Sequence, residues 1–466
     1  MIDSPRKVGL TARLRAVFFV VAAFVCAAGL SASLAFDPAW ADVRKTDVIL
    51  GQNVESRGLQ ASQCPSVDAE YALLIDKDGK VFFERGATEP AKIASMTKIM
   101  TAIVALENSE LTDTVVVDYE AATVGEASAS LLEGDSMDMK TALYALLVPS
   151  GNDAAIAIAK TVGAKMDPQS DDPEAVFVEA MNRKAAELGC RDTVFENPHG
   201  LDHEHFAGDF HSTAADMGVI VRCAMDNEQF RSIVGGGDAE ISVTSADGSV
   251  RDIALVSTDE LVGVYDGICG VKTGTTEEAG YCFAGAVVRD EGTFYSVVMN
   301  SPSSEQRFQD TVNLMDWAYE HLVAYPFENS TQSITSYAGG SAQDVPLIAQ
   351  FPHSDWIDRS VPVVLAESGA AATVFDLSGN ISQSIEYDEI HGDVHAGDVV
   401  GTITFLQRNQ VLDTIDLVAA EDVAAPTFFE GVGIWWDRLF RGFSGDASVA
   451  DEVIYNETPI LLDKTA

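Results

Sequence analysis

Basic residues are scarce in this sequence. Among 466 residues, 29 are lysine or arginine and 72 are aspartate or glutamate, so the formal net charge is −43. A surface of this sign repels phosphate backbones, and we therefore expect no nucleic-acid partner. The acidic excess is typical of salt-adapted secreted proteins and does not identify a substrate.

Repeats are lacking as well, because no segment recurs at a fixed period; this argues against a solenoid or a propeller. With 47% hydrophobic residues, a chain of this length has enough apolar material for two or more cores. We therefore expect a globular protein with more than one part.

The N-terminus lacks a twin-arginine pair, and no lipobox precedes Cys26. Instead, basic residues stand before an apolar run over residues 16–30, and residues 39–41 form an A-x-A cleavage pattern. This combination predicts a secretory signal peptide over residues 1–41. The alternative is an uncleaved anchor over residues 16–36, a stretch that could almost span a bilayer.

Cysteine is rare, and its spacing fits no zinc site. Five cysteines follow the leader: Cys64, Cys190, Cys223, Cys269 and Cys282. Because the number is odd, at least one thiol is free or pairs between chains in an oxidising compartment. The pairs Cys269–Cys282 and Cys190–Cys223 both remain open.

A Ser-x-x-Lys motif, Ser95-Met96-Thr97-Lys98, stands at the start of a strongly helical stretch, residues 96–107. Residues three apart share one face of a helix, so Lys98 should lie one turn from Ser95. A serine needs an adjacent base, and a lysine serves as that base when burial or a nearby positive charge lowers its pKa. The free N–H groups of the helix N-terminus suit a developing oxyanion. We predict Ser95 as the nucleophile and Lys98 as the base.

A second motif, Ser150-Gly151-Asn152, precedes a predicted helix over residues 153–162. Alone, it would indicate a helix cap in a loop. Beside the first motif, it predicts that Ser150 relays protons between Lys98 and the leaving nitrogen. Asn152 is then expected to hold Lys98 and a substrate amide.

A third motif, Lys272-Thr273-Gly274, is followed by Thr275 and ends a predicted strand, with residues 280–288 as the returning strand of a hairpin. A cation and a hydroxyl on an exposed strand suit a substrate carboxylate. The missing side chain of Gly274 would let the substrate backbone come close. Lys272 would also supply the positive charge that the catalytic base needs.

In order and spacing, the three motifs resemble those of penicillin-interacting serine enzymes. Segments at 195–202, 211–217 and 279–281 extend this resemblance to the low-molecular-mass penicillin-binding proteins, the serine-type D-alanyl-D-alanine carboxypeptidases. The likeness implies an α/β (α+β) catalytic domain over residues 42–325, in which helices flank an antiparallel sheet. No cofactor and no metal are implied.

The resemblance also implies an acyl-enzyme route, in which Ser95 attacks the bond between two D-alanines of a peptidoglycan stem peptide. Backbone N–H groups of Ser95 and Thr275 would form the oxyanion hole. Lys272, Thr273 and Arg307 would hold the terminal carboxylate; Arg307 is assigned by its position before the last helix of the domain. β-Lactams would be covalent inhibitors.

Two other functions remain as alternatives, a β-lactamase and a non-catalytic protein that binds β-lactams or the cell wall. A β-lactamase is disfavoured because Gly151 stands where the commonest of those enzymes carry aspartate. Their Glu-x-x-Leu-Asn deacylation motif is also absent.

Four histidines cluster with carboxylates in one short segment and could bind a metal. They are His199, His203, His205 and His211. The flanking sequence fits the family's structural pattern, and this favours a loop with solvated or capping histidines.

Beyond the catalytic domain, short strands separated by Gly, Asp and Asn predict a small β-sandwich over residues 326–425. The resemblance implies that this domain is a stalk, and it carries no catalytic motif.

Apolar residues at helical spacing then predict an amphipathic helix over residues 426–443. They are Phe428, Phe429, Val432, Trp435, Trp436, Leu439, Phe440 and Phe443. Such a helix suits a membrane interface, although packing on the β-domain is the alternative. Residues 444–466 are expected to form an acidic, disordered tail. Together with the leader, these features predict an exported enzyme of the cell envelope, at the outer face of the cytoplasmic membrane.

Overall fold

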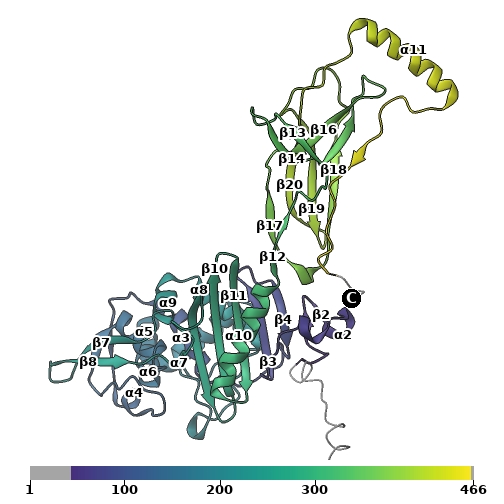
Figure 1. The fold of residues 1–466 in the computed structure, drawn as a ribbon. Coiled ribbons are helices and arrows are strands. Elements are labelled where there is room, and N and C mark those ends of the chain that lie inside the picture. The colour runs from purple at the N-terminus through teal and green to yellow at the C-terminus, as the bar shows by residue number, and fades with distance from the viewer. Residues whose placement is uncertain (1–42, 463–466) are drawn as a thin grey trace, which may run out of the picture. The chain divides into compact units, whose positions relative to one another are not determined.

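The computed structural model describes residues 43–462, which divide into two compact units (Figure 1). One unit ends at Met315 and the other begins at Asp316, against an expected boundary at residue 325. The expected signal peptide over residues 1–41 lies outside the described residues.

The first unit is built on a seven-stranded sheet in which every neighbouring pair is antiparallel. In spatial order its strands are β2 (Gln52–Asn53), β1 (Val48–Ile49), β4 (Val81–Arg85), β3 (Tyr71–Asp76), β11 (Gly292–Ser301), β10 (Gly280–Arg289) and β9 (Ile268–Thr276). The predicted hairpin is present as β9 and β10. Its strand β9 is an edge of the sheet, so the Lys-Thr-Gly motif has one open side.

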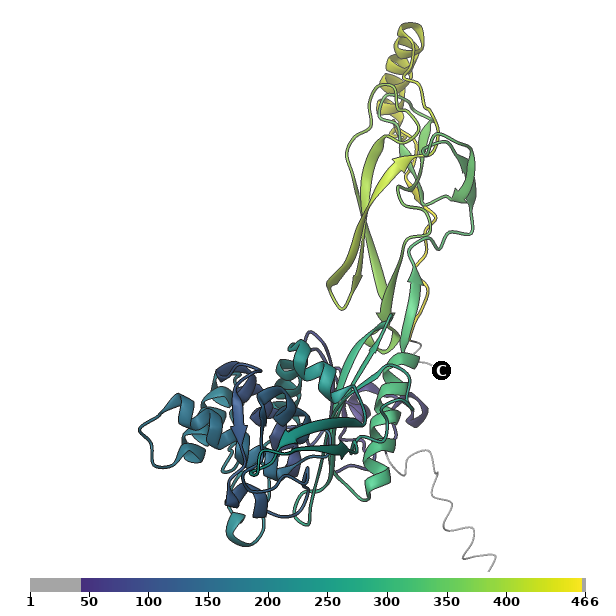
Figure 2. The same cartoon turned by 90° about the vertical axis from the view of Figure 1, so that its left-hand side faces the viewer.

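Helices cover both faces of this sheet, and Figure 2 shows them on its two sides. On one face α10 (Ser304–Glu320) packs through Phe308, whose ring centroid lies 5.0 Å from that of Phe283 on β10. On the other face α8 (Ala214–Met225) lies against β3 and β11. The absence of a side chain at Gly218 permits this approach, because a Cβ there would lie 2.4 Å from Leu73. The expected antiparallel sheet flanked by helices is confirmed.

Apart from α2 (Val54–Arg57), which follows β2, the remaining α-helices of the first unit gather beside this sheet with a small four-stranded sheet. The strands are β5 (Thr114–Val116), β6 (Ser136–Asp138), β7 (Ala239–Thr244) and β8 (Val250–Leu255), and the helices are α4 (Tyr119–Thr123), α5 (Met139–Leu147), α6 (Asn152–Met166), α7 (Pro173–Glu187) and α9 (Glu228–Val234). At their centre lies α3 (Thr97–Asn108), which is preceded by the 3₁₀ turn η3 (Ala94–Met96). Residues 97–105 of α3 are all buried. A helix surrounded by protein positions its side chains firmly, and this suits the predicted nucleophile and base.

The register of β9 and β10 rules out one of the two cysteine pairs. Cys282 lies opposite Gly274, whereas the thiol of Cys269 donates to the carbonyl of Ala286. The two cysteines are therefore separated by about four residues along the hairpin, or roughly 13 Å. A disulfide requires Cα atoms within about 7 Å. All five described cysteines are free thiols.

The second unit is an all-β structure that carries one long helix. Its main sheet has six strands in the order β18 (Ile381–Tyr387), β19 (Val399–Gln407), β20 (Gln410–Ala419), β16 (Ser360–Leu365), β15 (Ala349–Pro352) and β21 (Val453–Ile454). Two-stranded sheets are formed by β12 (Leu322–Pro326) with β17 (Ala371–Phe375) and by β13 (Ser333–Ser336) with β14 (Gln343–Pro346). The expected separate C-terminal β-region is confirmed.

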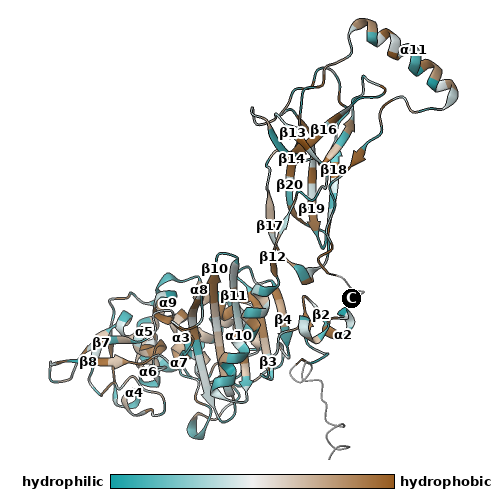
Figure 3. Cartoon of the chain, viewed as in Figure 1, coloured by the Kyte–Doolittle hydropathy of each residue, from teal (hydrophilic) through white to brown (hydrophobic). Residues whose placement is uncertain are grey.

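The long helix is α11 (Phe428–Ser444), which Figure 3 shows as a mixture of apolar and polar residues. It begins at a capping box in which Thr427 and Glu430 bond each other's backbone, and it ends at Gly445 in the left-handed conformation. These signals stabilise the helix at its ends and offset part of the cost of Gly431 and Gly433 in its interior. No helix within residues 43–462 has the length and apolar character needed to cross a membrane.

The expectation of a disordered tail after residue 444 is wrong for the described part of it. After α11 the chain returns to the main sheet, where β21 pairs with β15. Asn456 is buried, and its amide donates to Phe327 O at 3.0 Å and to Gln383 Oε1 at 2.8 Å. Its side-chain oxygen accepts from Asn329 N at 2.8 Å. The tail is therefore part of the β-unit, and α11 is an insertion between two of its strands.

Replacing Asn456 by alanine should destabilise the second unit by about 1–3 kcal/mol or more, because each buried polar partner left unpaired costs about that much. The four tryptophans after residue 42, namely Trp317, Trp356, Trp435 and Trp436, all belong to this unit. Urea unfolding of the full chain followed by tryptophan fluorescence therefore measures the effect. Gln410→Ala, at an exposed position on β20, is the control. An unchanged midpoint for Asn456→Ala would show that the tail contributes nothing to the unit.

Candidate active site

The predicted nucleophile and base are in contact. Lys98 is fully buried, and its Nζ lies 2.9 Å from Ser95 Oγ, 2.7 Å from Asn152 Oδ1 and 2.9 Å from the carbonyl oxygen of His199. Burial, with the positive charge of Lys272, holds the pKa of Lys98 well below its ordinary value, and Asp153 opposes this. A neutral amine beside a serine hydroxyl can accept its proton.

The turn that carries Ser95 is held in an uncommon backbone conformation. Ala94 has φ 47°, in the left-handed region, and its carbonyl accepts a hydrogen bond from Thr97 Oγ1 at 2.8 Å. Gly200 packs directly against it, since a Cβ on Gly200 would lie 2.0 Å from Ala94 O. The segment with Gly200 matched the family in sequence, but no pattern in the sequence showed that its glycine supports the nucleophile's turn.

The second motif lies where α5 gives way to α6. Asn152 is the first residue of α6 and is buried; its oxygen faces Lys98, and its Nδ2 donates to Gly125 O at 3.0 Å. Ser150 is also buried and has φ 65°. Among the described residues its hydroxyl bonds neither Ser95 nor Lys98. The proton-relay role of Ser150 therefore stays a prediction.

The third motif forms the other wall of the site. Lys272 on β9 is buried, and its Nζ donates to Thr273 O at 2.9 Å. Burial, followed by the charge of Arg307, lowers the pKa of Lys272 to about 7, and Asp259 opposes the shift. The Thr273 hydroxyl donates to Thr258 Oγ1 at 2.7 Å. A cation and a hydroxyl thus stand together beside the Ser95–Lys98 pair.

Gly274 has a packing role that the sequence did not reveal. A Cβ at this position would lie 2.7 Å from Ile93 O and 3.2 Å from Met96 N. Glycine therefore lets β9 lie directly against η3. The backbone at Gly274 and Thr275 is thereby brought beside the turn with Ser95, as a shared oxyanion hole requires.

Arg307 comes to the site from α10. Its Nη1 donates to Thr275 Oγ1 at 3.0 Å and lies 3.4 Å from Gly274 O, while Nη2 donates to Ser304 Oγ at 3.1 Å. The guanidinium is buried over the ring of Phe308, at 4.8 Å from its centroid. The side chain that the resemblance assigned by position alone therefore lies next to the Lys-Thr-Gly strand.

The histidine segment supports the site through His199, whose carbonyl oxygen accepts from Lys98. His199 is buried, its Nδ1 accepts from Leu201 N at 3.1 Å, and burial, followed by the charge of Lys98, keeps its pKa well below its ordinary value. Within residues 43–462, no group of three or more His, Cys, Asp or Glu side chains is arranged to hold a metal ion.

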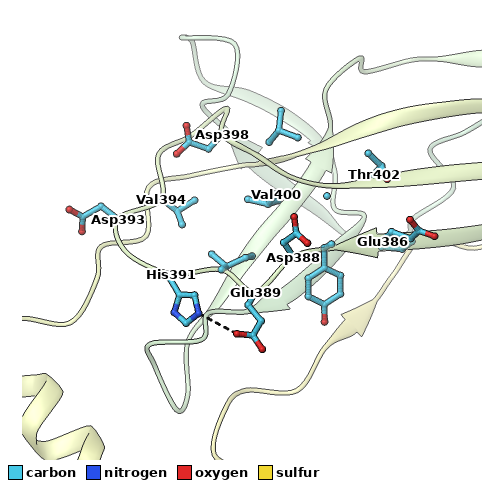
Figure 4. Close-up of a pocket in the computed structure, with 14 residues that line it drawn as sticks. Glu386, Asp388, Glu389, His391, Asp393, Val394, Asp398, Val400 and Thr402 are labelled. Carbon is cyan, nitrogen blue, oxygen red and sulfur yellow. Dashed lines mark hydrogen bonds and ion pairs between the residues drawn. The ribbon is translucent and has the colours of Figure 1, made fainter.

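A cavity of about 970 Å³ lies far along the chain, in the second unit (Figure 4). Acidic side chains line it together with His391, whose Nδ1 bonds Asp355 and whose Nε2 lies 3.4 Å from Glu389. Its lining residues include no lysine and no serine, so it contains no pair like Ser95 and Lys98.

The profile of the D-alanyl-D-alanine carboxypeptidase family matches residues 59–303, more than half of the chain and all three motifs. The chain belongs to this family. It is a serine-type D-alanyl-D-alanine carboxypeptidase, a penicillin-binding enzyme of peptidoglycan metabolism.

Individual relatives agree with this assignment. D-alanyl-D-alanine carboxypeptidase DacF of Bacillus subtilis is 28% identical over 78% of this chain and 87% of its own length. DacC of Escherichia coli is 28% identical over 82% of this chain and 90% of its own. The crystal structure of the Streptomyces K15 DD-transpeptidase is 30% identical and has a TM-score of 0.51, over 55% of this chain and 98% of that one. DacD of Francisella tularensis, at 21% identity and a TM-score of 0.52, shares the fold over 77% of this chain and 94% of its own.

Replacing Lys98 by methionine should keep the packing of α3 but remove the base, and it should slow acylation about 10²–10⁴-fold. In the wild type, acylation should fall as the pH drops through the pKa of Lys98, because only the neutral amine accepts a proton. Both effects are measured from the rate of labelling by a fluorescent penicillin. Lys140→Met, at an exposed position on α5, is the control. Wild-type labelling by Lys98→Met would mean that another group is the base.

Proposed function

We propose that this carboxypeptidase removes the terminal D-alanine from peptidoglycan stem pentapeptides through an acyl-enzyme on Ser95. The observation that carries the proposal is the buried amine of Lys98, held between Ser95 Oγ and Asn152 Oδ1 at 2.9 and 2.7 Å. Among the described residues no carboxylate forms an ion pair with Lys98, so no such pair keeps this amine protonated beside Ser95.

In the acylation step, Ser95 Oγ attacks the carbonyl carbon of the penultimate D-alanine while Lys98 takes its proton. Negative charge develops on the carbonyl oxygen, where the backbone N–H groups of Ser95 and Thr275 would stabilise it. Collapse of the intermediate breaks the C–N bond, and the departing D-alanine receives a proton through Ser150. Water then hydrolyses the ester and frees Ser95.

Recognition of the substrate carboxylate is assigned to Lys272, Thr273 and Arg307. Two buried cations and a hydroxyl at one strand edge support this role, since a carboxylate would compensate charges that are otherwise desolvated. A β-lactam carries a carboxylate at a comparable position and would acylate Ser95 in the same way.

The enzyme is proposed to act outside the cytoplasmic membrane, exported by its leader and held at the surface by α11. The eight apolar residues predicted for one face of α11 are exposed, from 40% at Leu439 to 86% at Phe429. The opposite side of the helix is fixed to its own unit, because Arg438 donates to Ser354 O at 2.6 Å and to Trp356 O at 3.1 Å. This anchorage supports membrane binding over packing on the β-domain, since it leaves the aromatic side chains free.

The function is tested with the variant Ser95→Ala, in which both D-alanine release from a stem pentapeptide and covalent labelling by a fluorescent penicillin should disappear. Ser109→Ala, at the opposite end of α3, should keep both activities. If Ser95→Ala were labelled normally, the nucleophile would be a different residue.

The membrane proposal is tested by replacing Phe428, Phe429, Phe440 and Phe443 together with serine, which should abolish sedimentation with zwitterionic lipid vesicles. Each buried apolar side chain contributes about 1.5–3 kcal/mol, so even one loss lowers binding about tenfold or more. Point substitutions are preferable to truncation after Pro426, because truncation would also remove β21 and Asn456. The matched control is the double substitution of Val399 and Val411 with serine, since both side chains are exposed, on β19 and β20. Vesicle binding that survives in the α11 variant would refute the role of this helix.

A further inference from the structure

A short loop, residues 257–261, lies against the Lys-Thr-Gly strand and is firmly held. Thr258 accepts from Thr273 Oγ1 at 2.7 Å, and its N–H donates to Val148 O at the end of α5 at 3.2 Å. The N–H of Ser257 donates to Asp238 Oδ1 at 2.8 Å. The loop is thus tied both to the carboxylate-binding strand and to the segment that leads into the second motif.

The residue after Thr258 in this loop is Asp259, whose charge interacts with those of Lys272 and Arg307. Asp259 is only 8% exposed, and its Oδ1 accepts from Leu261 N at 2.9 Å, whereas its Oδ2 is buried with no hydrogen-bond partner. Burial raises the pKa of Asp259 to about 6; the hydrogen bond from Leu261 N limits the rise most, followed by the positive charges of Lys272 and Arg307. An unpaired buried oxygen is costly, so the two cations add to the Leu261 hydrogen bond in stabilising this anion at neutral pH.

The negative charge that acts on Lys272 is that of Asp259. It makes no ion pair within 4.0 Å among the described residues; its contacts are the backbone and hydroxyl of Thr273. Burial and Arg307 favour its neutral form, and Asp259 is the group that favours its charged form. The other charged or titratable groups around Lys272 and Arg307 are Lys98 on α3, exposed Glu260 in the same loop, and Tyr281 and Cys282 on β10. Asp153 on α6 acts on Lys98.

We propose that Asp259 is a positioning residue for carboxylate recognition, which acts by keeping Lys272 in the ammonium form that binds the terminal D-alanine. The inference rests on the proposed role of Lys272 as carboxylate ligand. Without a negative charge at residue 259, a buried lysine beside a buried arginine would lose its proton at lower pH. The substrate would then have to bind together with a proton, and its KM would rise.

The test is Asp259→Asn, which keeps the acceptor for Leu261 N but removes the charge. Below about pH 5, Asp259 is already protonated and Lys272 is charged in both proteins, so their KM values for a stem pentapeptide should coincide. Through neutral pH the KM of the variant should rise above that of the wild type, about tenfold for each unit by which the pKa of Lys272 falls. At alkaline pH, where kcat no longer changes with pH, the kcat of the variant should stay near the wild-type value, because Ser95 and Lys98 are unchanged.

The outcome that would overturn the proposal is a KM of Asp259→Asn that is unchanged or lower at neutral pH; a lower KM would show that Asp259 mainly repels the substrate. Glu260→Gln is the matched control, since it removes one negative charge from an exposed neighbour and should leave the profile unchanged. Asp259→Glu should restore at least part of the wild-type profile. Thermal melting of each variant shows whether the fold is intact.

Lys272→Met distinguishes failure of this inference from failure of the proposed function. Its KM should be high, and adding Asp259→Asn to it should cause no further rise, because the charge that Asp259 maintains is already gone. If Lys272→Met has a normal KM, the carboxylate is held elsewhere and the basis of the inference is removed. If Lys272→Met has a high KM but Asp259→Asn is normal, the inference about Asp259 is refuted and the role of Lys272 stands.

Discussion

Burial of the Lys98 amine is the constraint on which the rest of the active site depends. A charged ammonium group in an apolar interior is very costly, so the group is neutral unless anions compensate it. Here its neighbours are a hydroxyl, an amide oxygen and a backbone carbonyl, all of them uncharged acceptors. After burial, the nearby positive charge of Lys272 also lowers the pKa of Lys98. Removal of the Lys98 amine from water therefore makes it a base. No special chemistry of lysine is needed.

Two close backbone approaches make this arrangement possible. Gly274 lets the edge strand β9 touch the turn before α3, and Gly200 supports the left-handed residue Ala94 in that turn. A side chain at either glycine would push apart elements that have to converge on Ser95. The strain at Ala94 is tolerated because the turn is packed from both sides, by β9 and by the segment that contains Gly200.

The second unit places its amphipathic helix inside the fold rather than at a loose end. The chain leaves the β-sheet at Thr427, forms α11, and returns to pair β21 with β15 and to bury Asn456. Both ends of the helix are thus attached to the same unit, and Arg438 fixes one of its sides. A helix held in this way presents its aromatic residues in a defined direction, which a free terminal helix would have to achieve by ordering on the membrane.

The sequence by itself determined the local features of this protein. Helical spacing placed Lys98 one turn from Ser95, the hairpin pattern gave β9 and β10, and the apolar spacing of residues 428–443 gave α11, because each depends on near neighbours in the chain. What only the tertiary structure decided depends on residues far apart. The contact of Thr275 with Arg307, the charge interaction of Asp259 with Lys272, the reason for Gly274, and the return of the tail through Asn456 all arise from packing between distant segments. Periodicity carries no information about such contacts, since it describes the face on which a residue lies and not what that face will touch.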